Sequence, residues 1–153
     1  MGQQTKGAQA ALDALATDST LTQTVVTGNL KALAITKLAA LDLAGYLDFD
    51  IGGYGWNSID RSDLLQAARR RAGEKHHTEY PPATIVVIGD TPNDVRAAHM
   101  GGARMIAVAT GKSSPGDLRN AGADRVLPDL TDLDSLQRTL HEFWHPAATG
   151  QSP

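Results

Sequence analysis

The stretch Thr84-Ile-Val-Val-Ile-Gly-Asp-Thr-Pro-Asn-Asp-Val95 decides how the rest of the chain is interpreted. Residues 85–88 are an unbroken run of β-branched residues, which predicts a strand buried on both faces of a parallel sheet. Gly89 ends that run, and Thr91 and Pro92 are typical of a helix N-cap and a first helical residue. The stretch therefore predicts a strand, a tight turn and a helix.

Two carboxylates, those of Asp90 and Asp94, come where this strand gives way to the helix. Ligands of open α/β folds bind at the carboxyl ends of the strands. Hard oxygen ligands at that edge suit Mg²⁺ better than a soft metal. The pair therefore predicts a magnesium site, and the alternative is that both residues only cap the helix and favour its positive end.

The composition limits the classes of protein that the chain can belong to. Its 153 residues fit one core domain over residues 1–145 and a disordered tail over residues 146–153. A net charge of −3 and a pI near 5.9 argue against a nucleic-acid partner, and the absence of cysteine excludes disulfides and thiolate zinc sites. No apolar run reaches membrane-spanning length, and the first residues lack the apolar stretch of a secretory signal. We expect a cytoplasmic protein that binds neither membranes nor nucleic acids.

Strand and helix periodicities alternate along the whole chain. The predicted strands cover residues 21–26, 47–51, 85–88, 104–109 and 125–127, and the predicted helices cover residues 7–16, 30–41, 62–72, 92–100, 115–120 and 132–144. Such alternation predicts an α/β fold, namely a Rossmann-like parallel sheet with helices on both faces.

A second polar turn follows the strand predicted at residues 21–26. Thr27, Gly28 and Asn29 bring a hydroxyl and several backbone N–H groups to the point where that strand meets a helix. This arrangement suits a phosphate group. An ordinary turn with Asn at a helix start is the plain alternative.

Gly89-Asp90-Thr91-Pro92-Asn93-Asp94 resembles the fourth motif, GDxxxD, of the haloacid dehalogenase-like (HAD) hydrolases, and the chain is most similar to their phosphoglycolate phosphatase-like members. The resemblance implies a Mg²⁺-dependent phosphatase that acts on a small phosphorylated metabolite through an aspartyl-phosphate. It also implies a role for each candidate residue: Asp90 and Asp94 hold Mg²⁺, Thr27 with the backbone of Gly28 and Asn29 binds the phosphate, and Arg61 offsets the crowded charge.

Arg61 departs from the family, whose third motif usually has a lysine before the corresponding helix. A guanidinium presents a planar fork of donors, whereas an ammonium is a point charge. A surface charge at the start of a helix is an equally acceptable interpretation of Arg61.

The family's first motif, a strand ending in Asp-x-Asp, has no counterpart at the expected place. Only 26 residues precede Thr27, and their acids, Asp13 and Asp18, fall in a predicted helix and a connector. Asp48-Phe49-Asp50 spells the pattern but follows the second motif, so we interpret it as a peripheral strand and not as the nucleophile. The resemblance therefore covers an incomplete HAD-like core, the part that follows the cap domain.

In the family the first-motif strand lies between the strands that end at the positions of Thr27 and Asp90. Without it, the two flanking strands could close up, a second copy or a complementing chain could fill the slot, or the chain could be a piece of a longer protein. We expect the chain alone to be inactive because it lacks the nucleophile. The alternative is a non-catalytic, truncated HAD-like module that acts as a partner or regulatory domain.

Three further patterns attract attention but do not change the prediction. His141-Glu142-Phe143-Trp144-His145 matches the zinc-binding pattern HExxH, yet Pro146 follows at once and no third ligand comes later. Thr110-Gly111-Lys112-Ser113 resembles the end of a P-loop without its first glycine, although Lys112 can border the site. The run Arg69-Arg70-Arg71 suits the end of a helix, where it complements the dipole.

Overall fold

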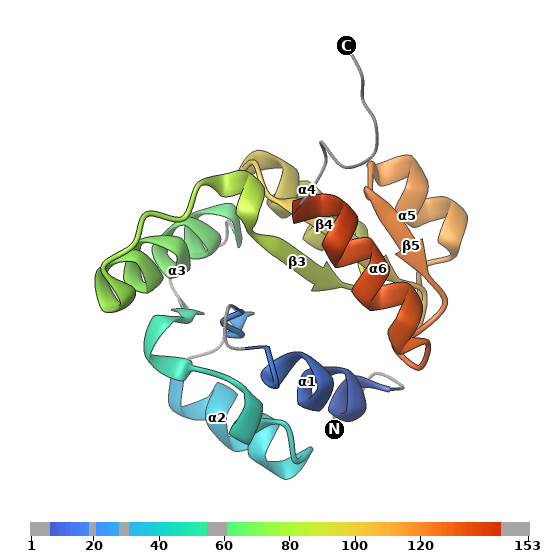
Figure 1. Cartoon of the computed structure of the whole chain (residues 1–153). Helices are drawn as coiled ribbons and strands as arrows, with labels where there is room; N and C mark the ends of the chain where they lie inside the picture. The colour runs from blue at the N-terminus through green and yellow to red at the C-terminus, as the bar shows by residue number, and fades with distance from the viewer. Residues whose placement is uncertain (1–6, 19–20, 28–30, 55–60, 145–153) are drawn as a thin grey trace. The chain divides into compact units, whose positions relative to one another are not determined.

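The computed structural model of the chain describes residues 7–18, 21–27, 31–54 and 61–144, without the side chains of residues 61 and 62 (Figure 1). The described residues fall into two compact units, Met1–Tyr80 and Pro81–Pro153, and each unit is described by itself. The paired strands of both units run parallel and are connected through helices, which confirms the α/β class. No described helix has both the length and the apolar character that a bilayer crossing requires.

The second unit is built on a three-stranded parallel sheet in the order β3-β4-β5. The strands are β3 (Val86–Gly89), β4 (Arg104–Val108) and β5 (Arg125–Leu127). The connecting and flanking helices are η3 (Pro82–Thr84), α4 (Pro92–Met100), α5 (Pro115–Ala121) and α6 (Leu133–Trp144). Helices α4 and α5 pack against each other and against the strands, and α6 is drawn in front of the sheet in Figure 1.

The core of the second unit centres on β4 and not on β3. Residues Met105–Val108 are at most 2% exposed, because β4 has a paired strand on each side. Strand β3 is an edge strand with half-buried residues, and Ile88 is 40% exposed. The prediction that residues 85–88 form a strand buried on both faces is therefore wrong, since pairing on one side only leaves β3 at the rim of the sheet.

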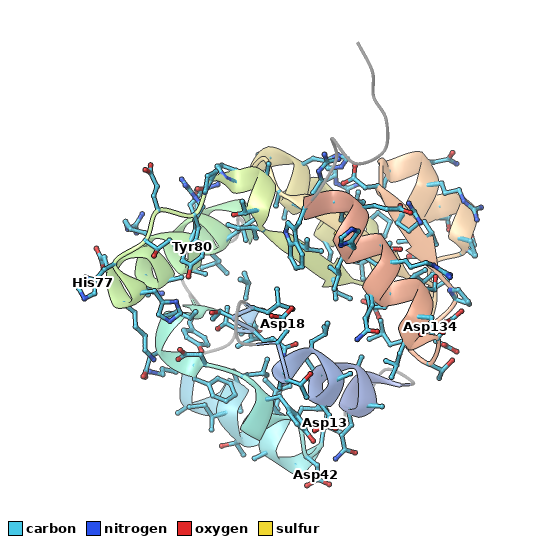
Figure 2. The ribbon with its side chains drawn as sticks, in the orientation of Figure 1. Asp13, Asp18, Asp42, His77, Tyr80 and Asp134 are labelled. Carbon is cyan, nitrogen blue, oxygen red and sulfur yellow. The ribbon has the colours of Figure 1, made fainter. Side chains whose placement is uncertain are left out.

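The first unit has a smaller sheet, in which β1 (Val26–Thr27) pairs with β2 (Gly53–Tyr54). Its helices are α1 (Ala8–Ala16), α2 (Lys31–Ala40), η1 (Ala44–Tyr46), η2 (Phe49–Ile51) and α3 (Arg61–His76). Asp42 and His77 have positive φ angles of 60° and 53° and lie just beyond α2 and α3, where a left-handed residue commonly ends a helix (Figure 2).

Two sequence predictions about the first unit need correction. The strand predicted over residues 21–26 is reduced to Val26–Thr27. The strand predicted over residues 47–51 is the 3₁₀-helix η2, because Asp48 caps it by accepting a hydrogen bond from the Asp50 N–H at 3.1 Å. A short polar side chain that bonds its own backbone favours such a turn over an extended strand.

Strand β2 is held very close to helix α3. A Cβ atom on Gly53 would lie only 2.2 Å from the backbone oxygen of Leu64, so the strand and the helix can meet at this distance only through a glycine. The strand that ends at Thr27 is thereby fixed to the rest of the first unit.

Candidate functional site

The carboxylate of Asp90 lies at the carboxyl edge of the second unit's sheet, directly after β3. It rests against Gly111 in the loop that leaves β4, and a Cβ atom on Gly111 would come within 2.6 Å of Asp90 Oδ2. Asp90 is half-buried, and its carboxylate makes no hydrogen bond or ion pair with the described residues. Its oxygens are therefore available to a ligand, in a niche that a side chain at position 111 would fill.

Asp94 lies next to Asp90 and has a structural role of its own. It forms a capping box with Thr91 at the start of α4: Asp94 Oδ2 accepts the N–H groups of Asp90 and Thr91 at 3.2 Å each, and Thr91 Oγ1 accepts the Asp94 N–H at 3.2 Å. The cap formed by Asp94 is thus confirmed, whereas its exclusive role as a cap is not. The cap does not exclude metal binding, because a carboxylate has about four acceptor positions.

Gly89 allows the Asp94 side chain to fold back over the end of β3. A Cβ atom on Gly89 would lie 2.6 Å from Asp94 Oδ2, so this close approach also requires a glycine. The two glycines at positions 89 and 111 leave room for the two carboxylates at one edge of one sheet. Both carboxylates lie where β3 gives way to α4, and their joint role as metal ligands stays a prediction.

The donor set fits a magnesium ion better than it fits a zinc ion. Mg²⁺ usually takes one or two protein carboxylates and completes its octahedron with water and substrate oxygens. Within the described part of the chain, no three His, Asp or Glu side chains gather closely enough to hold a metal by themselves. Asp90 and Asp94 could therefore hold Mg²⁺ together with water, whereas they are too few and too hard for a closed zinc site.

The predicted phosphate-binding residues belong to the first unit. Thr27 ends β1 and is half-buried, and its partner in the ladder is Tyr54. Gly28 and Asn29 lie outside the described residues. Arg61 is the first residue of α3, and its side chain also lies outside the described part. The structure therefore brings Asp90 and Asp94 together, and the meeting of Thr27 and Arg61 with them stays a prediction.

Both carboxylates of Asp48-Phe49-Asp50 form ion pairs with lysines. Lys75 Nζ lies 2.8 Å from Asp48 Oδ2 and 3.5 Å from Asp50 Oδ2, and Lys31 Nζ lies 3.3 Å from Asp50 Oδ1. The hydrogen bond and charge of Lys31 hold the pKa of Asp50 below its usual value, and the hydrogen bond to Asp48 raises the pKa of Lys75. These contacts join η2 to α2 and α3, which is a structural role.

The two acids that precede Thr27 do not follow a described strand. Asp13 lies on the exposed side of α1, and Asp18 is exposed just beyond that helix (Figure 2). Neither of them follows a β-strand, so neither has the surroundings of a first-motif nucleophile.

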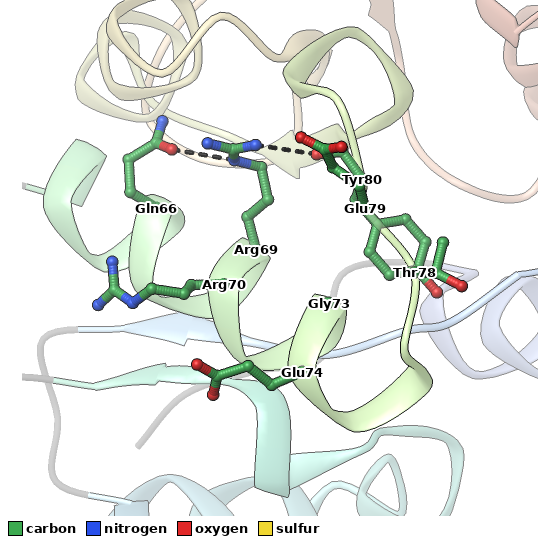
Figure 3. A pocket seen from close by; sticks show the side chains of 8 residues that line it. All are labelled: Gln66, Arg69, Arg70, Gly73, Glu74, Thr78, Glu79 and Tyr80. Carbon is green, nitrogen blue, oxygen red and sulfur yellow. Dashed lines mark hydrogen bonds between the residues drawn. The ribbon is translucent and has the colours of Figure 1, made fainter.

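A cavity of about 330 Å³ lies beside the C-terminal half of α3 and the loop after it (Figure 3). Arg69 spans it, because its Nε donates to Gln66 Oε1 and its Nη1 donates to the carbonyl oxygen of Tyr80, both at 3.0 Å. The cavity is lined by positively and negatively charged side chains and by none of the predicted site residues. The lining residues are Gln66, Arg69, Arg70, Gly73, Glu74, Thr78, Glu79 and Tyr80. The guanidinium of Arg69 holds the chain after α3 in place.

Two residues of the HExxH pattern in α6, Phe143 and Trp144, make packing contacts. The ring of Phe143 lies under the guanidinium of Arg104, 5.4 Å from its centroid, and Trp144 Nε1 donates to the carbonyl oxygen of Thr84 at 2.8 Å. His141 is exposed, and His145 lies outside the described residues. These contacts hold the end of α6 against β4 and η3.

Comparison with known proteins agrees with this geometry. The model of the HAD-hydrolase-like family matches residues 62–133, which include both carboxylates and the loop after β4. The chain is 26% identical over 113 residues to a phosphoglycolate phosphatase of Nitrosospira multiformis. Over residues 62–133 the chain is therefore similar to the HAD-like hydrolases.

Two solved structures are similar to this chain over more residues than the family model matches. A hydrolase from Pseudomonas syringae is 29% identical with a TM-score of 0.67, and the match covers 87% of this chain and 61% of the hydrolase. The structure of a predicted phosphatase from Clostridium acetobutylicum is 24% identical with a TM-score of 0.66, over 89% of this chain and 59% of the phosphatase, which supports the fold alone. The phosphoglycolate phosphatase match covers 72% of this chain, and the chain spans 47% of that relative's length.

Proposed function

We propose that this HAD-like chain carries the metal-binding and phosphate-binding part of a Mg²⁺-dependent phosphatase that acts on a small phosphorylated metabolite. The observation that supports the proposal most is the Asp90 carboxylate, which is half-buried at the sheet edge and has no partner among the described residues. A carboxylate that is left without a partner beside a glycine-lined niche is costly unless water or a ligand occupies it. The match to a phosphoglycolate phosphatase agrees with a phosphate ester as the substrate.

Each predicted residue has a stated part in this function. Asp90 and Asp94 would supply the carboxylate oxygens for the metal, and Asp94 would also keep the start of α4 fixed through its cap. Thr27, Gly28 and Asn29 would hold the phosphate through a hydroxyl and backbone N–H groups, and Arg61 would offset the surrounding charge. Bound Mg²⁺ would polarise the phosphoryl oxygens and neutralise developing charge.

Metal binding by the chain is the direct test of this function. We expect calorimetric titration with MgCl₂ to show one site in the wild type, and Asp90→Asn to remove it without loss of fold. Asp48→Asn is the matched control, because Asp48 is an acid of the same kind that pairs with Lys75 in the first unit. Equal Mg²⁺ binding by the wild type and Asp90→Asn would refute the proposal.

We propose that the 153-residue polypeptide has little or no phosphatase activity by itself. None of Asp13, Asp18, Asp48 and Asp50 directly follows a β-strand, and the last two are held in ion pairs. Turnover of p-nitrophenyl phosphate should therefore stay at the level of a blank. Turnover that Asp90→Asn abolishes and Asp48→Asn leaves unchanged would show that a nucleophile exists elsewhere in the chain.

The rim of β3 favours a partner of a particular kind, namely an added β-strand. Strand β3 is the edge strand of the described sheet, and it carries an apolar side chain, Ile88, that is 40% exposed. An open, apolar edge strand pairs readily with another strand. We propose that a second copy or a complementing chain covers this edge. Sedimentation of Ile88→Lys, compared with the wild type, tests the self-association.

We also propose that the protein acts in the cytoplasm without a membrane or nucleic-acid partner.

A further inference from the structure

Gly111 lies against the Asp90 carboxylate. A Cβ atom at this position would lie 2.6 Å from Asp90 Oδ2, 3.2 Å from Cγ and 3.5 Å from Cβ of the same residue. Real Cβ atoms essentially never come within 3.0 Å of another group, so one of the two groups would have to move. The carboxylate and a side chain at position 111 cannot share this space.

The backbone of Gly111 does not itself require a glycine. The positive φ angles among the described glycines belong to Gly7, Gly102 and Gly122, so an alanine at position 111 would not strain the chain. Gly116, a few residues further on, shows the contrast: its added Cβ would meet only Ser114 Oγ, at an ordinary distance of 3.7 Å. The requirement at position 111 therefore comes from the neighbouring carboxylate.

We infer that Gly111 is a positioning residue for the metal site, because the absence of its side chain lets the Asp90 carboxylate lie against the loop after β4. The inference rests on the proposed function, since it assigns a purpose to the position of Asp90. In an alanine variant the carboxylate must rotate away, and this rotation breaks no hydrogen bond because the carboxylate makes none with the described residues. The fold should therefore persist while the oxygens leave the position that a metal needs.

The test uses Mn²⁺ as the probe and the whole chain, labelled with ¹⁵N. In the wild type, Mn²⁺ should broaden the amide signals around Asp90 and Asp94. Gly111→Ala should keep the wild-type spectrum and unfolding midpoint. Its affinity for Mn²⁺ should fall by about tenfold or more, which is the loss typical of a change in the groups that position metal ligands. Gly116→Ala, the matched control, should bind Mn²⁺ as the wild type does.

A second readout needs no metal. Asp90→Asn should shift the Gly111 amide signal of the metal-free protein, because the two groups are in contact. In a separate measurement with Mn²⁺, adding Gly111→Ala to Asp90→Asn should cause no further loss of binding. Wild-type Mn²⁺ affinity in Gly111→Ala, or an unmoved Gly111 signal, would overturn the inference while the proposed function stands. An Mn²⁺ affinity that Asp90→Asn leaves unchanged would overturn the proposed function, and the inference with it.

Discussion

Replacing Asp94 by alanine separates its role as a helix cap from its role as a metal ligand. The substitution removes the acceptor of two N–H groups, those of Asp90 and Thr91, each at 3.2 Å. Loss of an N-cap partner costs about 1 kcal/mol. Loss of a carboxylate from the first turn of a helix costs about 0.3–1 kcal/mol more. Because both N–H groups are only half-buried, water can replace part of the loss, and we expect a decrease of about 1–2 kcal/mol in the free energy of unfolding.

Urea unfolding followed by Trp144 fluorescence measures this decrease in the second unit. Trp56→Phe leaves Trp144 as the remaining tryptophan of the chain, and Trp144 is hydrogen-bonded to Thr84 within the same unit as α4. We expect a loss of about 1 kcal/mol for Thr91→Ala, which removes only the acceptor of the Asp94 N–H.

Helix α5 supplies the matched control. Ser114 and Asp117 form a second capping box, in which Ser114 Oγ accepts the Asp117 N–H at 3.1 Å and Asp117 Oδ2 accepts the Ser114 N–H at 3.3 Å. Asp117→Ala should lower stability by a similar amount and leave Mg²⁺ binding unchanged, whereas Asp94→Ala should lower both. A change of less than about 0.3 kcal/mol for Asp94→Ala would refute the capping argument.

Three further predictions concern packing and charge. Gly53→Ala should destabilise the first unit strongly, because its Cβ would lie 2.2 Å from a backbone oxygen of Leu64, while Gly45→Ala, with nothing within 4 Å, should be neutral in thermal unfolding. Leu136→Ala should cost about 2–5 kcal/mol in urea unfolding, because the side chain is fully buried. Because the pKa of Asp50 is lower in the folded state, its charged form stabilises the folded protein at pH values above the unfolded pKa of the carboxyl group. Below about pH 4 the wild type should therefore lose stability more steeply than Asp50→Asn. Added salt should reduce this difference between the two proteins.

Local signals in the sequence were sufficient for the α/β class and for the strand–turn–helix at Asp90. The spacing Thr91-x-x-Asp94 is a capping signature, and the structure shows the box that it predicts. The edge rule for parallel strands correctly placed the two carboxylates at the carboxyl end of β3. Each of these predictions depends on residues within a few positions of one another.

One error came from contacts between residues far apart in the sequence, and another came from a local side-chain hydrogen bond. Residues 85–88 and 105–108 are both apolar runs, and only their pairing makes β4 the central strand and β3 the edge. Residues 47–51 alternate as a strand does, but the bond from the Asp50 N–H to Asp48 favours a turn. The closeness of Gly111 and Asp90 likewise has no signature within either segment, although both loops leave the same edge of one sheet.

We propose that the Asp90 carboxylate belongs to a Mg²⁺ site at the edge of β3 and β4. Crystals of the wild-type chain soaked in MnCl₂ and measured at the manganese absorption edge can test this proposal. We expect an anomalous peak roughly 2.1 Å from an Asp90 carboxylate oxygen, and we expect this peak to be lost in crystals of Asp90→Asn. A map with no peak beside Asp90, or with a peak that persists in Asp90→Asn, would contradict it.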